Sequence, residues 1–384
     1  MKKKIFISLI LAIAFISLSF FRVGVIVNAE ENCNVNAKAY VLADFYGGEI
    51  VESKNETEKY PIASMVKITT LSLVFDAIKD GRLNYNDDIT VSEYAFSMGG
   101  SQAFLDKNST YKAEELIKSV IVASANDSCV ALAEHLEGSV DSFVAKMNEK
   151  AKELGMENTN YVNCTGLPDP DGYSCAKDVL TITRYLMQND KFFEYAKVWM
   201  YDIEHPSGRT TSLTNTNKLV RFYNGMDGGK TGFTKEALSC LSCRATRGET
   251  SLVCVIIGAP DSKTRNASVT ALLNKGFASY ENKCIVKEGE AVKEKVSVKN
   301  AKSDTVECVY KNSLKSFGKK NSAQNITEKT VIYDICAPIR AGDELGESVF
   351  TLDDGKEYKV KIVAKNDVES KNYGDFIVDF AKNW

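Results

Sequence analysis

The chain has 384 residues, of which 44% are hydrophobic and 26% charged, and its formal net charge is −3. This composition is typical of a packed globular protein, and the length allows two ordinary domains with short appendages. The slightly acidic balance, with no basic stripe along the sequence, argues against a nucleic-acid partner.

The N-terminus carries the pattern of an export signal. Three lysines precede a long apolar run that Arg22 interrupts, and Val27 and Ala29 occupy the −3 and −1 positions of a candidate cleavage site. We expect residues 1–29 to be a signal peptide, and the alternative is an uncleaved membrane anchor. Both interpretations predict that the rest of the chain is exported.

All ten cysteines follow this signal, and an even count permits disulfides in an exported protein. Their spacings show no compact framework, and a chain of this length does not need cross-links. Several of them, including Cys240, Cys243 and Cys254, lie in apolar runs, where a free thiol behaves as a small hydrophobic group. We therefore expect mostly free cysteines.

In chain order, the first expected element is a hairpin at residues 38–54, whose two β-prone runs flank a Gly-Gly turn. A helix is expected at residues 64–80, between Pro61 and Gly81, two residue types that mark helix ends. Further elements are expected in this order: helices at residues 112–137 (broken near the middle), 140–154 and 176–188, a loop-rich stretch at 205–219, strands at 237–246 and 250–259, and a helix at 264–280.

The residue pattern of the sequence changes after about residue 283. Short β-prone runs alternate with charged turns, which predicts a small β-rich domain at residues 284–370 behind a main domain at residues 30–283.

The last segment, residues 371–384, is expected to be a short amphipathic tail. Its apolar residues recur at helical spacing, and they are Phe376, Ile377, Phe380 and Trp384. Such a stripe is typical of interfacial helices, yet Asp375 and Asp379 would be repelled by anionic lipid. Peripheral membrane contact and docking onto the protein's own surface therefore both stay open.

Ser64 and Lys67 form the first polar pair that is a candidate for catalysis. They are three residues apart at the start of an apolar helix, so the lysine amine can approach the serine hydroxyl. Burial would lower the lysine pKa and make its neutral amine available as a base, and the helix N-terminus favours negative charge on the serine. Alone, an S-x-x-K match is weak evidence.

Ser124 and Asn126 lie in the break of the 112–137 stretch. A polar interruption between apolar runs costs helix stability, and its side chains need hydrogen-bond partners. Alone, this triplet is typical of an ordinary helix junction.

The third signal is Lys230-Thr231-Gly232. A phosphate-binding loop is the nearest alternative, but the spacing from Gly225 is one residue short and the required strand and helix are missing. At a strand edge these residues suit a carboxylate, because the ammonium attracts it, the hydroxyl donates a hydrogen bond and the glycine lets an extended substrate approach.

Together the three motifs are specific. Their order, with 60 residues from Ser64 to Ser124 and 106 from Ser124 to Lys230, resembles that of the low-molecular-mass penicillin-binding proteins, the D-alanyl-D-alanine carboxypeptidases of serine peptidase family S11. The resemblance runs from about residue 36 to residue 281. It implies an α/β (α+β) fold of the penicillin-binding-protein/β-lactamase-like transpeptidase type, in which an antiparallel sheet has flanking helices and a helical subdomain, followed by the C-terminal β-rich domain.

Carried over by position, the resemblance makes Ser64 the acylated nucleophile and Lys67 its general base. Ser124 would relay a proton toward the leaving amine, and Asn126 would hold Lys67 and the substrate amide. No metal and no organic cofactor is implied.

The same resemblance assigns substrate binding to the third motif. Lys230 and Thr231 would bind the terminal carboxylate beside Gly232, and the backbone N–H groups of Ser64 and Phe233 would form the oxyanion hole. Arg265 stands where the family has a second carboxylate-binding cation.

One position departs from the family. Leu238 replaces a glycine near the cleft, which could alter substrate fit without touching the acylation residues.

The function implied is a penicillin-sensitive serine D,D-carboxypeptidase that removes the terminal D-alanine from peptidoglycan stem pentapeptides at the outer face of the cytoplasmic membrane or in the cell wall. β-Lactam antibiotics would acylate the same serine. A β-lactamase is disfavoured because no E-x-x-L-N follows Ser124, whereas a D,D-endopeptidase and a non-catalytic cell-wall scaffold stay open. With only two histidines, of which His135 is expected on an apolar helix face, no Ser-His-Asp triad is indicated.

Overall fold

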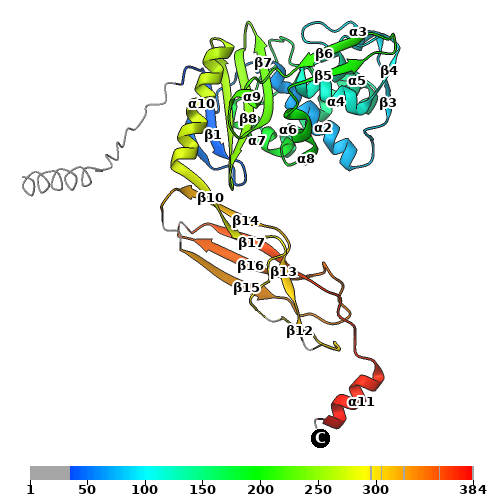
Figure 1. Cartoon of the computed structure of the whole chain (residues 1–384), viewed down its shortest axis with the longest axis vertical. Helices are drawn as coiled ribbons and strands as arrows, with labels where there is room; N and C mark the ends of the chain where they lie inside the picture. Colours follow the sequence, from blue (N-terminus) through cyan, green and yellow to red (C-terminus); the bar gives the residue numbers. More distant parts are fainter. Residues whose placement is uncertain (1–34, 295, 304, 323–324, 354, 383–384) are drawn as a thin grey trace, which may run out of the picture. The chain divides into compact units, whose positions relative to one another are not determined.

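The computed structural model describes residues 35–294, 296–303, 305–322, 325–353 and 355–382. The predicted signal peptide lies outside these residues. Figure 1 labels the elements along the chain. Within the described ranges, no helix is both long enough and apolar enough to cross a membrane.

A five-stranded antiparallel sheet forms the centre of the main domain, with the strand order β2-β1-β9-β8-β7. Its strands are β1 Ala39–Asp44, β2 Ile50–Lys54, β7 Met226–Thr234, β8 Leu238–Arg247 and β9 Thr250–Ala259. The predicted 38–54 hairpin and the two later strands are thereby confirmed. β7 is an edge strand, so its outer backbone groups can face a ligand.

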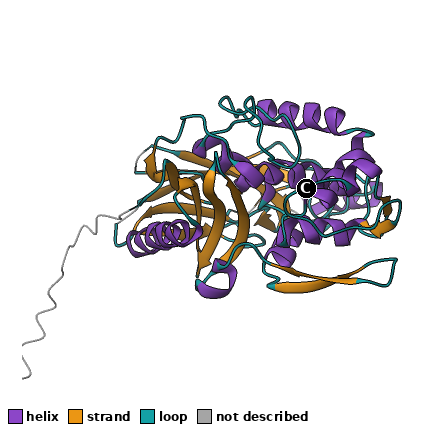
Figure 2. Ribbon diagram, turned by 90° about the horizontal axis from the view of Figure 1, so that it is seen from above, coloured by secondary structure: helices purple, strands orange, loops and turns teal. Residues whose placement is uncertain are grey.

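The sheet separates two hydrophobic cores. α10 (Ser262–Ser279) covers one face, and α2 (Lys67–Lys79) and α7 (Ala176–Leu186) belong to the helical group on the other (Figure 2). Cys240 packs into the core on the helical-group side and Cys243 into the core under α10, because positions i and i+3 of a strand point to opposite faces. Cys240 and Cys243, which form a C-x-x-C pattern, are therefore not a chelating pair.

A helical subdomain and two small strand pairs complete the main domain. The remaining elements are α3 Glu93–Phe96, α4 Ala113–Val122, α5 Asn126–Glu137, α6 Val140–Glu153, α8 Asp190–Ala196, α9 Leu219–Phe222, the pair β3 Asp88–Thr90 and β4 Thr110–Lys112, and the pair β5 Met200–Glu204 and β6 Thr210–Thr214. The predicted break between α4 and α5 is confirmed. Ser124 there has φ 64°, which a right-handed helix cannot accommodate.

The prediction of a loop-rich stretch at residues 205–219 was wrong in part. β5 and β6 form a hairpin, and each strand buries a single residue, Ile203 and Leu213. With so few apolar positions the period-2 pattern that reveals a half-buried strand is too weak to detect.

The predicted β-rich region is confirmed and has a hydrophobic core of its own, which includes Val296, Phe350 and Ile362. Its strands are β10 Tyr280–Val286, β11 Val296–Ser297, β12 Thr305–Val306, β13 Cys308–Tyr310, β14 Leu314–Lys319, β15 Ile326–Ile332, β16 Glu344–Leu352 and β17 Glu357–Ala364. The largest sheet has the order β13-β17-β16-β15.

The tail forms the helix α11, Tyr373–Lys382, and exposes Ile377 and Val378. The side chains of Phe376 and Phe380, and all of Trp384, lie outside the described part, so the proposed apolar stripe stays a prediction.

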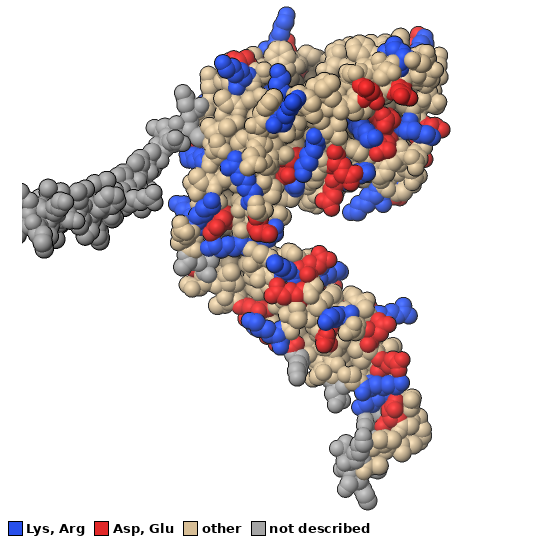
Figure 3. All heavy atoms as spheres, viewed as in Figure 1, with Lys and Arg blue, Asp and Glu red and all other residues tan. Residues whose placement is uncertain are grey.

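The nine cysteines of the described residues are all free, as expected, and Cys33 falls outside them. Basic and acidic side chains are interspersed over the face seen in Figure 3, so neither sign dominates the electrostatic field there.

Candidate active site

The first motif lies where a 3₁₀ turn, η1 (Ala63–Val66), leads into α2. The Nζ atom of Lys67 donates to Ser64 Oγ at 3.0 Å and to the carbonyl oxygen of Thr165 at 2.5 Å. Lys67 is fully buried, and this loss of solvation lowers its pKa. Ser64 is only half-buried, so the hydroxyl that a neutral Lys67 can deprotonate is accessible to a substrate.

The second motif lies at the junction of α4 and α5, where both side chains are buried. Asn126 donates from Nδ2 to the carbonyl oxygen of Gly99 at 2.7 Å, whereas its Oδ1 has no hydrogen-bond partner within the described part of the chain. The expected hydrogen bond between Asn126 and Lys67 is not among those of the described residues, because Lys67 donates to Ser64 and Thr165 instead. The oxygen of Asn126 can still accept a substrate amide N–H.

The third motif brings Lys230 beside the second. Its Nζ donates to Ser124 Oγ at 2.8 Å and to the backbone oxygen of Thr231 at 3.0 Å. Lys230 is also buried, and this burial, together with the charge of Lys67, sets its pKa well below that of a solvated lysine. Thr231 donates to the hydroxyl of Thr216 at 2.8 Å.

Gly232 brings β7 into contact with the serine turn. A Cβ atom on Gly232 would lie 2.6 Å from the carbonyl oxygen of Ile62 and 3.2 Å from the nitrogen of Ser64. Phe233, the next residue, is 66% exposed. The closeness of the two backbones is compatible with the oxyanion hole expected from Ser64 and Phe233, which stays a prediction.

Arg265 is buried within α10, inside the helix expected at residues 264–280. Its guanidinium donates to the carbonyl oxygen of Cys240, the residue paired with Gly232 across the strands, at 3.3 Å, and to Asn266 Oδ1. It is close enough for its charge to lower the pKa of Lys230. Its role as a second carboxylate-binding cation stays a prediction.

The chain matches the family model of the D-alanyl-D-alanine carboxypeptidases, peptidase family S11, over residues 26–261. The chain belongs to this family. It is therefore a serine-type D-alanyl-D-alanine carboxypeptidase of the low-molecular-mass penicillin-binding class. The model of the C-terminal domain of penicillin-binding protein 5 matches residues 280–370.

Named relatives and solved structures cover most of the chain. The D-alanyl-D-alanine carboxypeptidase DacF of Bacillus subtilis is 35% identical over 91% of this chain and 90% of its own length, and DacC of Escherichia coli is 29% identical with the same coverage. Penicillin-binding protein 5 of Haemophilus influenzae has a TM-score of 0.68 at 29% identity, over 88% of this chain and 98% of that structure. PBP3 of Streptococcus pneumoniae has a TM-score of 0.73 at 25% identity, over 87% and 100%.

One position of this carboxypeptidase departs from the glycine expected of the family. Leu238, at the start of β8, has φ 57°, in the left-handed region that favours glycine. The backbone thus keeps a glycine-type conformation although the side chain has changed.

Sequence reasoning missed the segment around Thr165, whose carbonyl oxygen binds Lys67. Gly166, with φ 79°, packs so closely that a Cβ would lie 2.0 Å from the carbonyl oxygen of Ala63. Asn163 Oδ1 accepts from the backbone nitrogens of Thr165 and Gly166 and so fixes the turn. The sequence marks a turn here, but no residue type reveals that a carbonyl points at the lysine.

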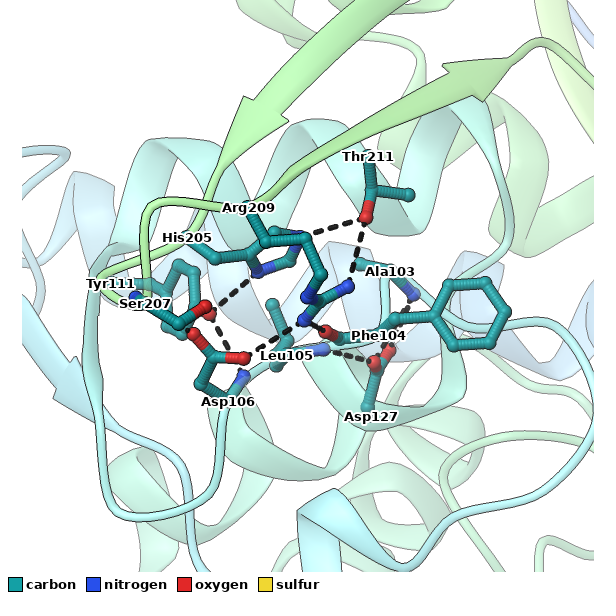
Figure 4. A network of polar contacts seen from close by, with 10 residues as sticks. All are labelled: Ala103, Phe104, Leu105, Asp106, Tyr111, Asp127, His205, Ser207, Arg209 and Thr211. Atoms are coloured by element: carbon teal, nitrogen blue, oxygen red, sulfur yellow. Dashed lines mark hydrogen bonds and ion pairs between the residues drawn. The ribbon is translucent and has the colours of Figure 1, made fainter.

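A polar network holds the segment that binds Asn126 (Figure 4). Asp127, the next residue, is buried and accepts from the backbone nitrogens of Ala103 and Leu105. This segment also supplies the carbonyl oxygens of Gly99 and Ser101, which accept from Asn126. Asp127 thus holds the loop whose carbonyl oxygens bind Asn126 and position it.

The hairpin β5–β6 also forms hydrogen bonds with this segment. Arg209 donates to Asp106 and to the carbonyl oxygen of Phe104, and His205 lies between the hydroxyls of Tyr111 and Thr211 at 2.7 and 2.8 Å (Figure 4).

The two histidines have different surroundings. Burial lowers the pKa of His205, which favours the neutral ring within its network. His135, expected on an apolar helix face, is instead exposed on α5, because the buried positions of that helix end at Ala133. Across the described ranges, no group of three or more His, Cys, Asp and Glu residues is placed to hold a metal ion.

Proposed function

We propose that the protein removes the terminal D-alanine of peptidoglycan stem pentapeptides through an acyl-enzyme on Ser64. The observation that supports this most is the 3.0 Å contact between Ser64 Oγ and the buried amine of Lys67. Burial lowers the pKa of Lys67 and so favours its neutral amine, which can accept the serine proton.

The reaction proceeds in two halves. Ser64 Oγ attacks the carbonyl carbon between the two D-alanines while Lys67 takes its proton, and the backbone N–H groups of Ser64 and Phe233 stabilise the oxyanion. The C–N bond then breaks, and the proton reaches the leaving amine through Ser124. Water attacks the resulting ester and releases the shortened peptide.

The other site residues hold the substrate. Lys230 and Thr231 bind the terminal carboxylate, with Arg265 as a further cation behind the strand, and the Oδ1 atom of Asn126 accepts the substrate amide N–H. A bound carboxylate favours the charged form of Lys230, which compensates for the burial that lowers its pKa in the free enzyme.

The chain would act outside the cytoplasm, where peptidoglycan is exposed. Family membership supports this location, and the proposed signal peptide at residues 1–29 would provide the route. The tail helix α11 would give peripheral membrane contact, supported by its exposed Ile377 and Val378.

Fluorescent penicillin and a peptide ending in D-Ala-D-Ala test the proposal. The purified protein is expected to be labelled and to release D-alanine, whereas its Ser64→Ala variant does neither. Labelling without D-alanine release would point to cross-linked peptides as substrates, and thus to a D,D-endopeptidase. Absence of labelling would favour the non-catalytic scaffold.

A further inference from the structure

A pocket of about 570 Å³ opens beside the serine turn, outside the residues assigned to the reaction. Residues 59–63 line it on one side, the segment 160–173 lines most of the other, and Thr234 and Glu236 close it at the end of β7. Val66, two residues after the nucleophile, also lines it. The pocket therefore adjoins the reacting centre without containing it.

The direction of β7 determines which part of a substrate reaches this pocket. Along the strand, Lys230 comes first, Gly232 packs against the turn of Ser64, and Thr234 lies in the pocket wall. A peptide with its carboxylate at Lys230 and its scissile carbonyl at Ser64 runs antiparallel to this edge strand. Since an extended residue spans about 3.3 Å, the residue that precedes the two D-alanines lies beside the pocket.

The pocket wall combines an apolar surface with charges of both signs. Ile62, Val66 and Leu167 are among its apolar residues, and its charged residues are Lys59, Asp169 and Glu236. No ion pair between Lys59 and either carboxylate occurs among the described residues, whose ion pairs involve other partners.

The ammonium of Lys59 has a defined place in this wall. Its Nζ lies 4.5 Å from the ring centroid of Tyr173 and 3.5 Å from the Tyr173 hydroxyl. A cation–π contact of this kind restrains the lysine while leaving it able to bind an anion. A fitting occupant has an apolar stem and carries both an ammonium and a carboxylate at its tip.

We propose that this pocket binds the side chain of the residue preceding the D-alanine pair and selects a diamino acid with both an amine and a carboxylate on its distal carbon. Diaminopimelate has this chemistry, whereas lysine has the amine alone. Lys59 receives the distal carboxylate, and Glu236 and Asp169 receive the ammonium. This inference rests on the proposed function, since it names the substrate class of the same site.

Two matched peptides test the selection. Each has the sequence acetyl-L-Ala-γ-D-Glu-X-D-Ala-D-Ala, where X is meso-diaminopimelate or L-lysine, and kcat/KM for D-alanine release is measured for both. Because an exposed ion pair contributes about 0.2–1 kcal/mol, the diaminopimelate peptide is expected to be cleaved about 1.4- to fivefold more efficiently.

Three variants test the contributions of the charged residues separately. Lys59→Met is expected to remove the preference by slowing only the diaminopimelate peptide, and Glu236→Gln to slow both peptides by similar factors, because both carry the amine. Lys235→Met is the matched control, since Lys235 is an exposed lysine that does not line the pocket. It should leave the preference unchanged.

The outcomes are distinguishable. Equal cleavage of both peptides by the unmutated protein, an equal loss for both in Lys59→Met, or loss of the preference in Lys235→Met would each overturn the pocket assignment and leave the proposed function intact. Release of D-alanine from neither peptide would contradict the proposed function and the pocket assignment together.

Discussion

Two serine–lysine pairs lie in the active site, and they differ more in exposure than in distance. Ser64 and Lys67 are 3.0 Å apart on the turn that opens α2, and Ser124 and Lys230 are 2.8 Å apart between a helix junction and an edge strand. Both lysines are buried and have lowered pKa values. Ser64, however, is half-buried, whereas Ser124 is only 3% exposed. Similar pairs can thus take different roles, because only Ser64 offers a hydroxyl that a substrate carbonyl can reach.

Removing each serine in turn tests whether the two pairs have different roles. Ser64→Ala is expected to lower the rate of acylation by penicillin about 10⁴-fold or more, since the nucleophile is lost. Ser124→Ala removes a proton relay and should cost about 10²-fold. Stopped-flow or gel labelling measures both rates, with Ser101→Ala, an exposed serine near the site, as the control. A larger loss in Ser124→Ala than in Ser64→Ala would reverse the assignment.

The next largest loss of acylation is expected when the base is removed. Lys67→Met fills the same buried space without an amine, so acylation is expected to fall about 10³-fold while the fold persists. The acylation rate of the unmutated protein should rise with pH through the lowered pKa of Lys67 and then level off, because the neutral amine is the active form. An acylation rate in Lys67→Met equal to that of the unmutated protein would exclude Lys67 as the base.

Gly232→Ala tests whether the two pairs depend on close backbone contact. The added Cβ would meet the carbonyl oxygen of Ile62 at 2.6 Å, so β7 must move away from the turn of Ser64. A shift below 1 Å is expected to lower acylation about 10-fold, since catalysis is sensitive to such displacements. Circular dichroism checks the fold, and an unchanged rate would show that the contact tolerates displacement.

Asp127→Asn should disturb the second pair from a distance. The new amide group presents donors to the backbone nitrogens of Ala103 and Leu105, and the loop that holds Asn126 loosens. We expect a loss of about fivefold in kcat/KM for a D-Ala-D-Ala peptide. Asp106→Asn, in the outer part of the same network, is the matched control and should have a smaller effect. Equal effects would mean that Asp127 only stabilises the fold.

The smallest expected effect is on stability. The pKa of Lys67 is lowered on folding, so below the ordinary lysine pKa, about 10.4, the unfolded chain binds more protons on this group and folding is opposed. Lys67→Met should therefore raise the free energy of unfolding by about 1 kcal/mol at pH 7, because it removes a buried amine. The gain should vanish near pH 10.5. Urea unfolding at both pH values measures it, and a gain independent of pH would rule out this cause.

The sequence predicts side-chain chemistry better than it predicts backbone contacts. The spacing of Ser64 and Lys67 places them on one face of a turn, and the polar break at Ser124 marks a helix junction, so these placements follow from local rules. The carbonyl oxygen of Thr165 lies 98 residues from Lys67 in sequence, and nothing in its residue type indicates that it accepts from a lysine.

Two further features of the structure were not predicted from the sequence. The hairpin β5–β6 was not predicted because its strands bury one residue each. The hydrogen bond from Arg265 to the carbonyl oxygen of Cys240 depends on how α10 lies over the sheet, which local sequence does not determine.

Ser64, and not Ser124, is the serine that we expect to become acylated. Intact-mass measurement after incubation with benzylpenicillin, followed by digestion and fragment sequencing, locates the adduct directly. We predict one penicilloyl group per chain, on the peptide that contains Ser64. An adduct on the peptide that contains Ser124, or none at all, would exclude Ser64 as the nucleophile.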